Sequence, residues 1–322
     1  MRYIIFLLLL FVFSACEQEE LPIIPHTSGE VLTQQIELES DYRNQIFYKL
    51  DGNMISSSNL KVDWDMAFES SVDGWRILVN SSTFSQVGEF QNIDFFDVNT
   101  VNNIVWKWDN PEGIYEGTAI GDYRSSNNIY IIDRGYTLNG NSRGYRKIMI
   151  DTVTEEYYQI TYSKLDNTDI NTLKITKNSN YNFTYFSFTN DSIVNIEPNY
   201  NQWDLCFTQY THLFPDNEET PSYLVTGVLT NYLNDISVAI DSVSNFDDIN
   251  YEMISMYEFN NQQDDIGYNW KYYDFDNEIY NVHPYINYII KNQEERYFKL
   301  HFLDFYNNNG EKGYPLFEIQ EL

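Results

Sequence analysis

The five residues Trp-Asp-Met-Ala-Phe at 64–68 return in related form as Trp-Asp-Leu-Cys-Phe at 203–207. Each copy follows a strand-like segment that ends in a polar turn. The interval from the Phe of that segment to the Trp of the motif is 17 residues in both copies, counted from Phe47 and from Phe186. A further apolar strand segment follows each motif. This recurrence predicts an ancient duplication and two related β halves.

The predicted units cover about residues 40–85 and 180–232. Side chains alternate between the two faces of a strand, so the Trp and the residue two places later share one face and the Asp lies on the other. For Asp65 and Asp204 this pattern favours a structural hydrogen-bonding role at a strand start over catalysis. The second unit is longer within 211–219, and an enlarged loop is where a site is expected.

Composition sets the class of protein. The chain has 322 residues with a formal net charge of −29, which argues against nucleic-acid binding because phosphate contacts need clustered Lys and Arg. Aromatic residues make up 17% of the chain, too many for a disordered protein, and they favour strands. We therefore predict an all-β fold, mainly of antiparallel sheets with one or a few short helices, whose two halves form one domain.

Local patterns predict particular elements. Strands are expected at 147–151 and 157–162, and a hairpin is expected where 173–176 and 183–188 flank the turn Asn-Ser-Asn. Another hairpin is expected where 297–306 and 314–319 flank Asn-Asn-Gly-Glu. The apolar residues Phe246, Ile249, Met253, Met256 and Tyr257 have the spacing of one helical face, which predicts a helix beginning near Ser244 or Asn245.

The N-terminal residues have the pattern of an export signal. Residues 1–15 hold one positive charge, an apolar run and small residues before Cys16, which is typical of a secretory signal peptide. The position of Cys16 resembles a bacterial lipobox and predicts its lipidation. Residues 16–35 are then a flexible, lipid-anchored tether, and 36–322 form the β domain. Cys206 would be the remaining mature thiol, and its apolar strand predicts a buried hydrophobe.

The motifs resemble those of the HmuY-like haem-binding lipoproteins of Bacteroidetes. The resemblance rests on five segments, which occur in order across nearly the whole mature chain: 64–81, 203–211, 223–231, 266–271 and 304–315. The acidic run that follows Cys16 is also similar to the surface-export signal of such lipoproteins. The chain corresponds to a long form of the family.

The resemblance implies a β-rich domain that is anchored by lipid at the outer membrane and faces outward. It implies a haemophore-like function in iron acquisition, with haem or a haem-carrying protein as partner and a TonB-dependent receptor as the destination. Members hold the iron through two axial side chains, His in some and Met in others. The resemblance does not map both ligands onto this chain.

Several His and Met residues are candidate ligands for the haem iron. His212 is the first candidate, for haem binding and as metal ligand, because it lies in the enlarged loop of the second unit beside Tyr210, Leu213 and Phe214. His283, in a loop before Pro284, and Met253, on the predicted helix, are secondary haem-binding candidates, since a thioether also ligates haem iron. His26 is expected to be a linker residue and His301 a solvated strand residue.

Other chemistries have less support. The chain contains no Gly-x-Ser-x-Gly, His-Glu-x-x-His, phosphate-binding glycine loop or Cys-x-x-Cys. No carboxylate pair is singled out for hydrolysis, so we predict a protein that is not an enzyme, and rank a hydrolase last. The alternative to haem binding is a surface binding module for glycan or protein, because Tyr and Trp supply contact area at low entropic cost.

Overall fold

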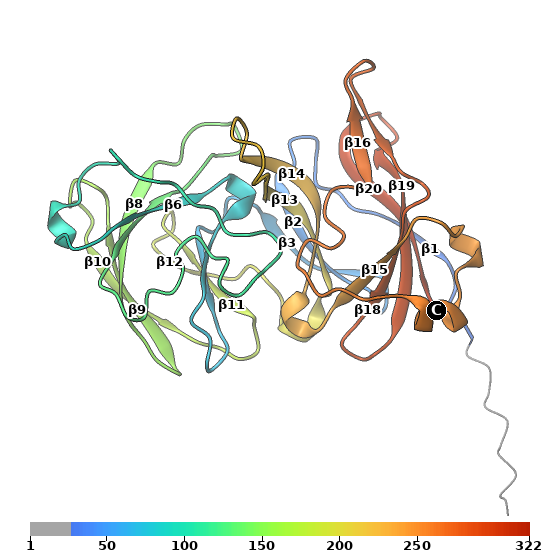
Figure 1. The fold of residues 1–322 in the computed structure, drawn as a ribbon, viewed down its shortest axis with the longest axis horizontal. Helices are drawn as coiled ribbons and strands as arrows, with labels where there is room; N and C mark the ends of the chain where they lie inside the picture. Colours follow the sequence, from blue (N-terminus) through green and yellow to red (C-terminus); the bar gives the residue numbers. More distant parts are fainter. Residues whose placement is uncertain (1–26) are drawn as a thin grey trace, which may run out of the picture.

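A computed structural model describes residues 27–322, which form two β-rich halves side by side (Figure 1). In this part of the chain every strand pairing is antiparallel, in four larger sheets and one two-stranded sheet. The helical segments of these residues are short 3-10 turns of three to six residues. The prediction of an all-β, antiparallel fold with a few short helices is confirmed.

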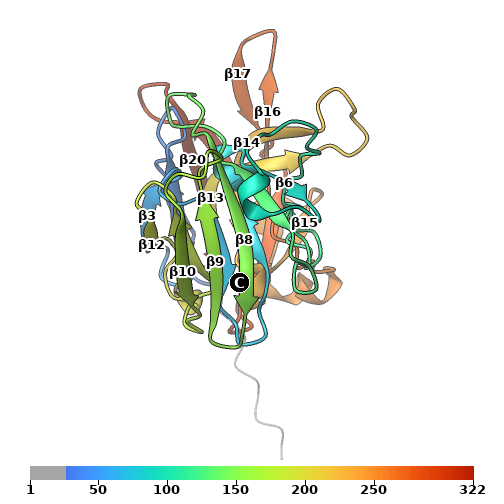
Figure 2. The same cartoon turned by 90° about the vertical axis from the view of Figure 1, so that its left-hand side faces the viewer.

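The first half packs a five-stranded outer sheet on a four-stranded inner sheet. The outer order is β10-β9-β8-β7-β6 and the inner order is β12-β11-β4-β5. The strands are β4 (Met66–Glu69), β5 (Ile77–Val79), β6 (Gln86–Phe90), β7 (Ile129–Asp133), β8 (Tyr145–Val153), β9 (Tyr157–Ser163), β10 (Asn171–Thr176), β11 (Phe183–Ser187) and β12 (Ser192–Val194). Phe68, Ile148 and Tyr158 are fully buried between the two sheets. Figure 2 shows the outer sheet from outside.

The second half repeats this arrangement. Its outer order is β1-β20-β19-β18-β15 and its inner order is β14-β13-β2-β3. The strands are β1 (Leu32–Gln35), β2 (Asn44–Lys49), β3 (Met54–Leu60), β13 (Leu205–Leu213), β14 (Ser222–Thr230), β15 (Ser237–Asp241), β18 (Asn287–Lys291), β19 (Tyr297–Tyr306) and β20 (Lys312–Glu321). Tyr48, Phe207 and Leu300 belong to the core between these sheets.

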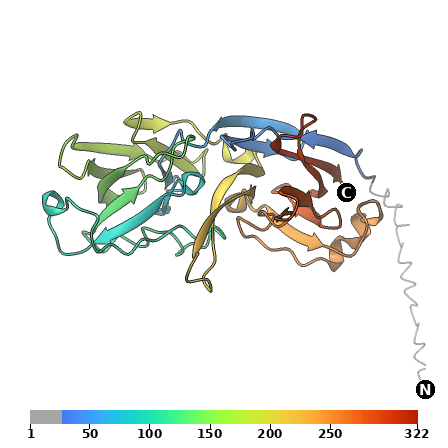
Figure 3. The same ribbon diagram turned by 90° about the horizontal axis from the view of Figure 1, so that it is seen from above.

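The two inner sheets pack against each other and join the halves. A third apolar cluster lies between them and includes Phe47 and Trp203 from one side and Trp64 and Phe183 from the other. Phe47 meets Trp203 edge to face, with ring centroids 5.0 Å apart. The layers therefore follow the order outer, inner, inner, outer along the long axis, and Figure 3 shows the two halves in a row from above.

The halves exchange hairpins. The hairpin β2–β3 precedes the first Trp-Asp motif in the chain, yet β2 pairs with β13 of the second unit, with Phe47 opposite Cys206. Reciprocally, β11 pairs with β4, with Phe186 opposite Met66. Each inner sheet is thus built from strands of both sequence units, and neither half is a contiguous piece of chain.

The predicted helix over 246–257 is wrong in type. The segment forms two 3-10 turns, η5 (Phe246–Asp248) and η6 (Tyr251–Met256), separated by the extended residue Asn250. The cause is a buried lysine, because Nζ of Lys299 donates to the carbonyl oxygens of Phe246 and Ile249 at 2.5 and 2.9 Å. A continuous α-helix would use these carbonyls for its own hydrogen bonds. The other 3-10 turns are η1 (Ser81–Thr83), η2 (Phe95–Asp97), η3 (Tyr200–Gln202) and η4 (Tyr232–Asn234).

The same lysine arrangement occurs in the first half. Nζ of Lys147 on β8 donates to the carbonyls of Phe95 and Val98 at 2.7 and 2.8 Å and lies 4.6 Å from the centroid of the Phe95 ring. Lys299 on β19 lies 4.4 Å from the Phe246 ring. Burial lowers the pKa of both lysines. The internal correspondence therefore extends into the outer sheets, beyond the predicted units.

Hairpin predictions succeeded where the partner strand was local. The strands predicted at 147–151 and 157–162 are β8 and β9, and the predicted hairpin of 297–306 with 314–319 is β19–β20. The predicted hairpin of 173–176 with 183–188 is wrong: β10 pairs with β9, whereas β11 pairs with β12 and β4. The Asn-Ser-Asn turn between them carries the chain from the outer sheet to the inner one.

Ordered structure begins before the predicted domain boundary at residue 36. The strand β1 lies within the segment expected to be tether, and it pairs with β20, placing Leu32 opposite Ile319. The backbone N–H of Gly29 also donates to the carbonyl of Glu321 at 2.8 Å. The N-terminal edge of the second half is therefore closed by residues that the composition alone assigned to a linker.

Candidate functional site

Asp65 lies at the centre of a buried ion-pair cluster. Its Oδ1 is 2.9 Å from Nε of Arg134 and 3.1 Å from Nη2 of Arg143, and Oδ2 accepts the backbone N–H of Phe188 at 2.8 Å. The Asp65 side chain has no exposed surface. The cluster ties β4, the connection after β7, and the exchanged hairpin β11–β12 into one unit.

Asp204 makes the corresponding contacts in the second half. Its Oδ1 is 3.0 Å from Nζ of Lys49, and its Oδ2 accepts the backbone N–H of Leu50 at 2.8 Å. Burial raises the pKa of Asp204, and the charge of Lys49 opposes that shift. Both motif aspartates therefore bind the hairpin donated by the other sequence unit, and this contact is structural, with no opening to solvent.

The structural correspondence differs from the sequence interval by one residue. The backbone N–H of Asp65 donates to the carbonyl of Phe186, whereas that of Asp204 donates to the carbonyl of Tyr48. Phe186 therefore corresponds to Tyr48 rather than to Phe47. The structurally matching intervals are therefore 16 residues, from Tyr48 to Trp64, and 17 residues, from Phe186 to Trp203.

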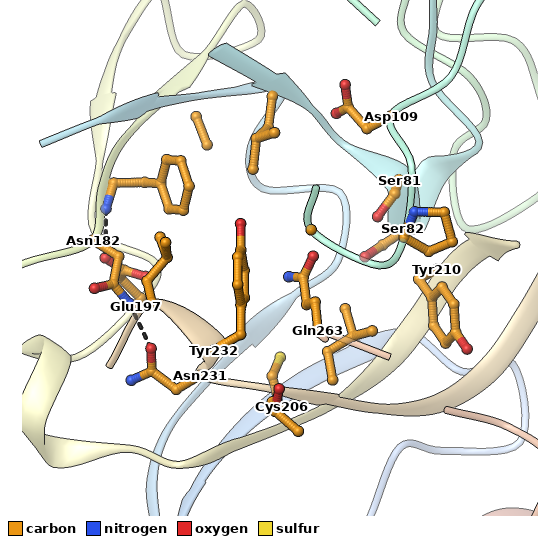
Figure 4. Close-up of a pocket in the computed structure, with 18 of the residues that line it drawn as sticks. Ser81, Ser82, Asp109, Asn182, Glu197, Cys206, Tyr210, Asn231, Tyr232 and Gln263 are labelled. Atoms are coloured by element: carbon orange, nitrogen blue, oxygen red, sulfur yellow. Dashed lines mark hydrogen bonds between the residues drawn. The ribbon is translucent and has the colours of Figure 1, made fainter. Parts of the chain in front are cut away.

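An interior cavity lies between the two inner sheets, and we call it the interhalf cavity (Figure 4). Its volume is about 90 Å³. Its aromatic lining residues are Phe47, Trp64, Phe183, Tyr185, Tyr210, Trp203 and Tyr232. The loop 109–118 covers one side, and a Cβ added to Gly113 would lie 2.7 Å from the Tyr232 ring, which shows how closely the loop packs.

Two carboxylic acids line the interhalf cavity. Glu197 is buried; its Oε1 accepts the backbone N–H of Phe183 at 2.8 Å and its Oε2 lies 3.4 Å from the hydroxyl of Tyr185. Burial raises the pKa of Glu197 to about 8. Asp109, which is partly buried, accepts the backbone N–H groups of Val79 and Ala119 at 2.8 and 2.7 Å, and burial raises its pKa to about 7.

Cys206 lies on β13, lines the same cavity and is 4% exposed, as the sequence predicted. Burial raises the pKa of its thiol to about 12. Because the thiolate is the reactive form, we expect native Cys206 to react with a thiol reagent at pH 8 about a thousandfold more slowly than in the urea-unfolded chain. A stopped-flow thiol assay on protein lacking residues 1–16 measures both rates, and equal rates would contradict this assignment.

His212 lies in β13, one residue before its end, and not in the loop where the sequence placed it. Its ring packs edge to face with Phe214 and Tyr268, at centroid distances of 4.9 and 5.0 Å. Nδ1 is buried, lacks a hydrogen-bond partner among the described residues, and lies 3.7 Å from Oδ2 of Asp264. Burial lowers the pKa of His212, so the ring is neutral at pH 7. Burial and the charge of Glu112 raise the pKa of Asp264 to about 6.

The structure does not bring His283 and Met253 together. His283 follows the small hairpin of β16 (Lys271–Asp274) and β17 (Ile279–Val282), stacks on Tyr272 and lies with Nδ1 3.2 Å from the Tyr285 hydroxyl. This hairpin meets the end of β19, since the N–H of Tyr280 donates to the Tyr306 hydroxyl. Met253 lies in η6, which packs at the start of β19. Ten strand residues span about 30 Å, so the two candidates lie at opposite ends of that strand.

No hydrogen bond, ion pair or ring contact joins His212 to His283 or to Met253 within residues 27–322. His301 is not the solvated strand residue that alternation predicted. Its ring stacks on Phe246 with centroids 4.0 Å apart, and its Nε2 lies 3.0 Å from Oε2 of Glu318. His26 lies outside the described residues.

The β16–β17 hairpin projects from the second half (Figure 1). It carries exposed aromatic side chains. Phe275 at its turn is 84% exposed and Tyr272 is 47% exposed. Tyr273 and Tyr285 are exposed as well. Scattered exposed apolar residues are ordinary on a protein surface, but a group on one projecting hairpin marks a contact surface.

Comparison with known proteins finds one family similarity. Residues 179–319 match the family model described as HmuY protein. The similarity to the HmuY family is therefore shown for this segment of the chain. The match begins just before β11 and ends within β20, so it includes one exchanged hairpin, β11–β12, and excludes the other, β2–β3. No curated protein matches the chain.

Two solved structures are similar at low identity. Apo PinO from Porphyromonas gingivitis is 8% identical, with 91% of this chain and 97% of that chain covered and a TM-score of 0.31. The Tannerella forsythia apo HmuY analog (TFO) is 9% identical, with 92% and 98% covered and a TM-score of 0.34. At these scores the HmuY assignment rests on the family match alone.

Haem, the ligand that the HmuY resemblance implies, needs an axial ligand, apolar contact for the porphyrin and groups that tolerate two propionates. His212 fits the first requirement, because its ring is neutral and its Nδ1 faces a carboxylate, as in carboxylate–histidine–metal arrangements. Phe214 and Tyr268 fit the second. Lys271 is buried and donates its Nζ to the carbonyl of Thr226, so it is not free to meet a propionate. A bound haem would be held through His212 and covered by Phe214 and Tyr268.

The predicted signal peptide 1–15, the predicted lipidation site Cys16 and most of the predicted tether lie outside the described residues. Among residues 27–322 no helix is long and apolar enough to cross a membrane.

Sequence reasoning missed the partners of the candidate residues. Asp264 lies 52 positions after His212 in sequence, and Glu197 and Asp109 lie in segments that carry no known motif. Glu197 follows Ile196 and precedes Pro198, directly before the second Trp-Asp motif. The apolar neighbours of Glu197 were the one feature of the sequence that could have indicated its burial.

Proposed function

We propose that this protein is a non-catalytic binding protein of the HmuY family, anchored by lipid through Cys16 at the outer membrane, facing outward, and that it binds haem. In this proposal His212 supplies an axial ligand to the iron. A haem-carrying protein supplies the ligand, and a TonB-dependent receptor receives it. The tether then extends from Cys16 to the residues that precede β1.

The observation that carries the proposal is the environment of His212. Its Nδ1 is buried and turned toward Asp264, which leaves Nε2 as the nitrogen for the iron. A quarter of the side-chain surface is exposed, so a planar ligand can approach at the end of β13. Haem iron bound to imidazole supplies ligand exchange and electron transfer chemistry, whereas the protein residues only hold and cover it.

Titration of haemin into protein lacking residues 1–16 tests this function. We expect a saturable Soret shift with a stoichiometry of one, and we expect His212→Ala to abolish it or to lower the affinity at least about tenfold. His26→Ala is the matched control and should leave the titration unchanged. Because burial lowers the pKa of His212, the shift should persist to a lower pH than it would with a solvent-exposed histidine as the ligand.

The same titration of His283→Ala and Met253→Leu examines the second axial position. Their separation along β19 predicts that at most one of them alters the spectrum. If neither oxidised nor reduced haemin produces a saturable shift with the unaltered chain, the haem proposal fails.

The exposed aromatic residues of the β16–β17 hairpin favour a second candidate function, a surface module that binds a glycan or a protein. Tyr and Phe side chains stack on sugar rings and on apolar protein surfaces with little entropic cost. In this case Tyr272→Ala combined with Phe275→Ala should weaken retention on a glycan array or on the receptor at least about tenfold. Ile240→Ala, an equally exposed apolar residue on β15, is the control, and identical binding by all variants would rule out the hairpin.

A further inference from the structure

Glu197 differs from the other buried acids of the described residues. Three of the five have a cation partner: Asp65, Glu69 and Asp204. A fourth, Asp241, accepts hydrogen bonds from two backbone N–H groups and from the Tyr257 hydroxyl, which hold its pKa at about 2. Glu197 has no cation partner among the described residues, and its hydrogen bonds from the Phe183 N–H and the Tyr185 hydroxyl, at 2.8 and 3.4 Å, do not prevent burial from raising its pKa to about 8.

Burying an acid without a cation is costly, so such a group either stays protonated or takes a cation from outside. The lining of the interhalf cavity includes one cation, Arg76, and that guanidinium is already paired with Glu69 at 3.0 and 3.1 Å. Nη1 of Arg76 donates to the hydroxyl of Tyr232. Arg76 is therefore not available to Glu197.

The walls of the cavity suit an organic cation. Trp64 meets Tyr185 edge to face at 5.0 Å, Phe47 meets Trp203 in the same way, and Tyr232 lies beside them. Aromatic faces attract ammonium groups, most strongly where water is excluded. A metal ion such as Ca²⁺ would instead need about six to eight oxygen ligands, which this lining does not gather.

A buried donor of the cavity also lacks a hydrogen-bond partner among the described residues. Trp203 is 6% exposed, and its Nε1 has no hydrogen bond within the described part of the chain. An indole N–H only donates, so its partner must be an acceptor atom. A ligand that carries an ammonium group and a hydroxyl oxygen would serve both Glu197 and Trp203.

We propose that the interhalf cavity binds a small aliphatic ammonium ion, with Glu197 as its carboxylate partner and the aromatic rings as its walls. The volume of about 90 Å³ limits the ligand, since an apolar cavity of about 150 Å³ admits benzene. The ligand therefore has about four non-hydrogen atoms. This site is separate from His212, and its occupation does not depend on haem.

Entry requires movement of the loop 109–118. Asp109 fastens the base of this loop through its hydrogen bonds with Val79 and Ala119, and the carbonyl of Glu112 accepts the N–H of Gln263 from the second half. Figure 4 shows Asp109 and Glu197 on different sides of the cavity, with the Tyr232 ring between them in this view. An occupied cavity should therefore slow amide hydrogen exchange in 109–119.

Calorimetric titration of the mature chain with chloride salts of ethylammonium, trimethylammonium and ethanolamine tests the proposal, with ethanol as a neutral control. We expect dissociation constants of about 0.1–1 mM for the ammonium ions and no binding of ethanol. Ethanolamine should bind most tightly, and Trp203→Phe should remove that preference. Glu197→Gln should lower the affinity for every ammonium ion at least about tenfold. Glu218→Gln, at an exposed position, and His212→Ala should leave these affinities unchanged.

The pH dependence gives a readout that does not need a variant. An ammonium ion must displace the proton of Glu197, so affinity should rise as the pH increases from 6 to 8 and then level off. Among the other titratable groups of the cavity, Tyr185 and Cys206 stay neutral in this range because burial raises both pKa values far above it. Asp109, whose pKa burial raises to about 7, ionises within the range and adds to the same rise, so Asp109→Asn separates its contribution from that of Glu197. No binding by 10 mM, equal binding of ethanol, or a flat pH profile would each overturn the proposal.

Discussion

Replacing Asp65 by Asn is expected to lower the free energy of unfolding by about 3–5 kcal/mol. The carboxylate has no exposed surface and is shared by Arg134 and Arg143, so its removal leaves two buried guanidinium groups without their counter-charge. The variant also weakens the bond from the Phe188 N–H, which fastens the exchanged hairpin β11–β12. Breaking a buried ion pair from one side costs more than the pair itself contributes.

Urea denaturation followed by tryptophan fluorescence measures this loss. Asp73→Asn, an exposed residue in the turn between β4 and β5, is the matched control and should stay within about 0.5 kcal/mol of the unaltered protein. Asp204→Asn should give a smaller loss than Asp65→Asn, because Lys49 is its single cation partner and retains some exposure. A loss below 1 kcal/mol for Asp65→Asn would mean that the cluster does not hold the exchanged hairpin β11–β12 in the first half.

The segment 179–319, expressed alone, is expected to remain unfolded although the HmuY family match covers it. Without β2, the strand β13 loses one of its two neighbouring strands, and the core of the second half loses Tyr48. Without β4 the hairpin β11–β12 has no sheet to join. Each large apolar side chain removed from a core costs about 2–5 kcal/mol, which together exceeds the stability of a typical domain.

Far-UV circular dichroism, amide dispersion in NMR spectra and limited proteolysis decide this outcome, with 27–322 as the folded reference. Adding residues 27–62 as a separate peptide supplies β1 to β3 and should restore part of the structure. A cooperative thermal transition of 179–319 alone would show that the exchange of hairpins is dispensable.

The sequence predicted elements whose partners are close along the chain. The β19–β20 hairpin was predictable because its turn residues and both strands lie within one window, and β8 and β9 for the same reason. The hairpin prediction failed at β10 and β11, because the same kind of turn there joins strands of different sheets. A turn signal describes the turn and carries no information on distant partners, which here lie more than 100 residues away.

The candidate site was predictable only in part for a related reason. The apolar neighbours of His212 singled it out, but Asp264, which faces its ring, comes from another strand connection. Glu197 and the Trp203 indole share a cavity that exists only when two sheets from both halves meet. Burial of a polar group depends on tertiary packing, and alternation along one strand did not foresee it at His301 either.

The exchange of hairpins also means that paired strands are synthesised at different times. Met66 pairs with Phe186, so β4 leaves the ribosome about 120 residues ahead of its neighbour, a delay of roughly 6–24 s at the usual speed of synthesis. During that interval the edges of β2 and β4 are open to unwanted pairing with other chains. The delay suits the export proposed above, because a chain that cannot complete either sheet early stays unfolded, as translocation requires, until its second half has been made.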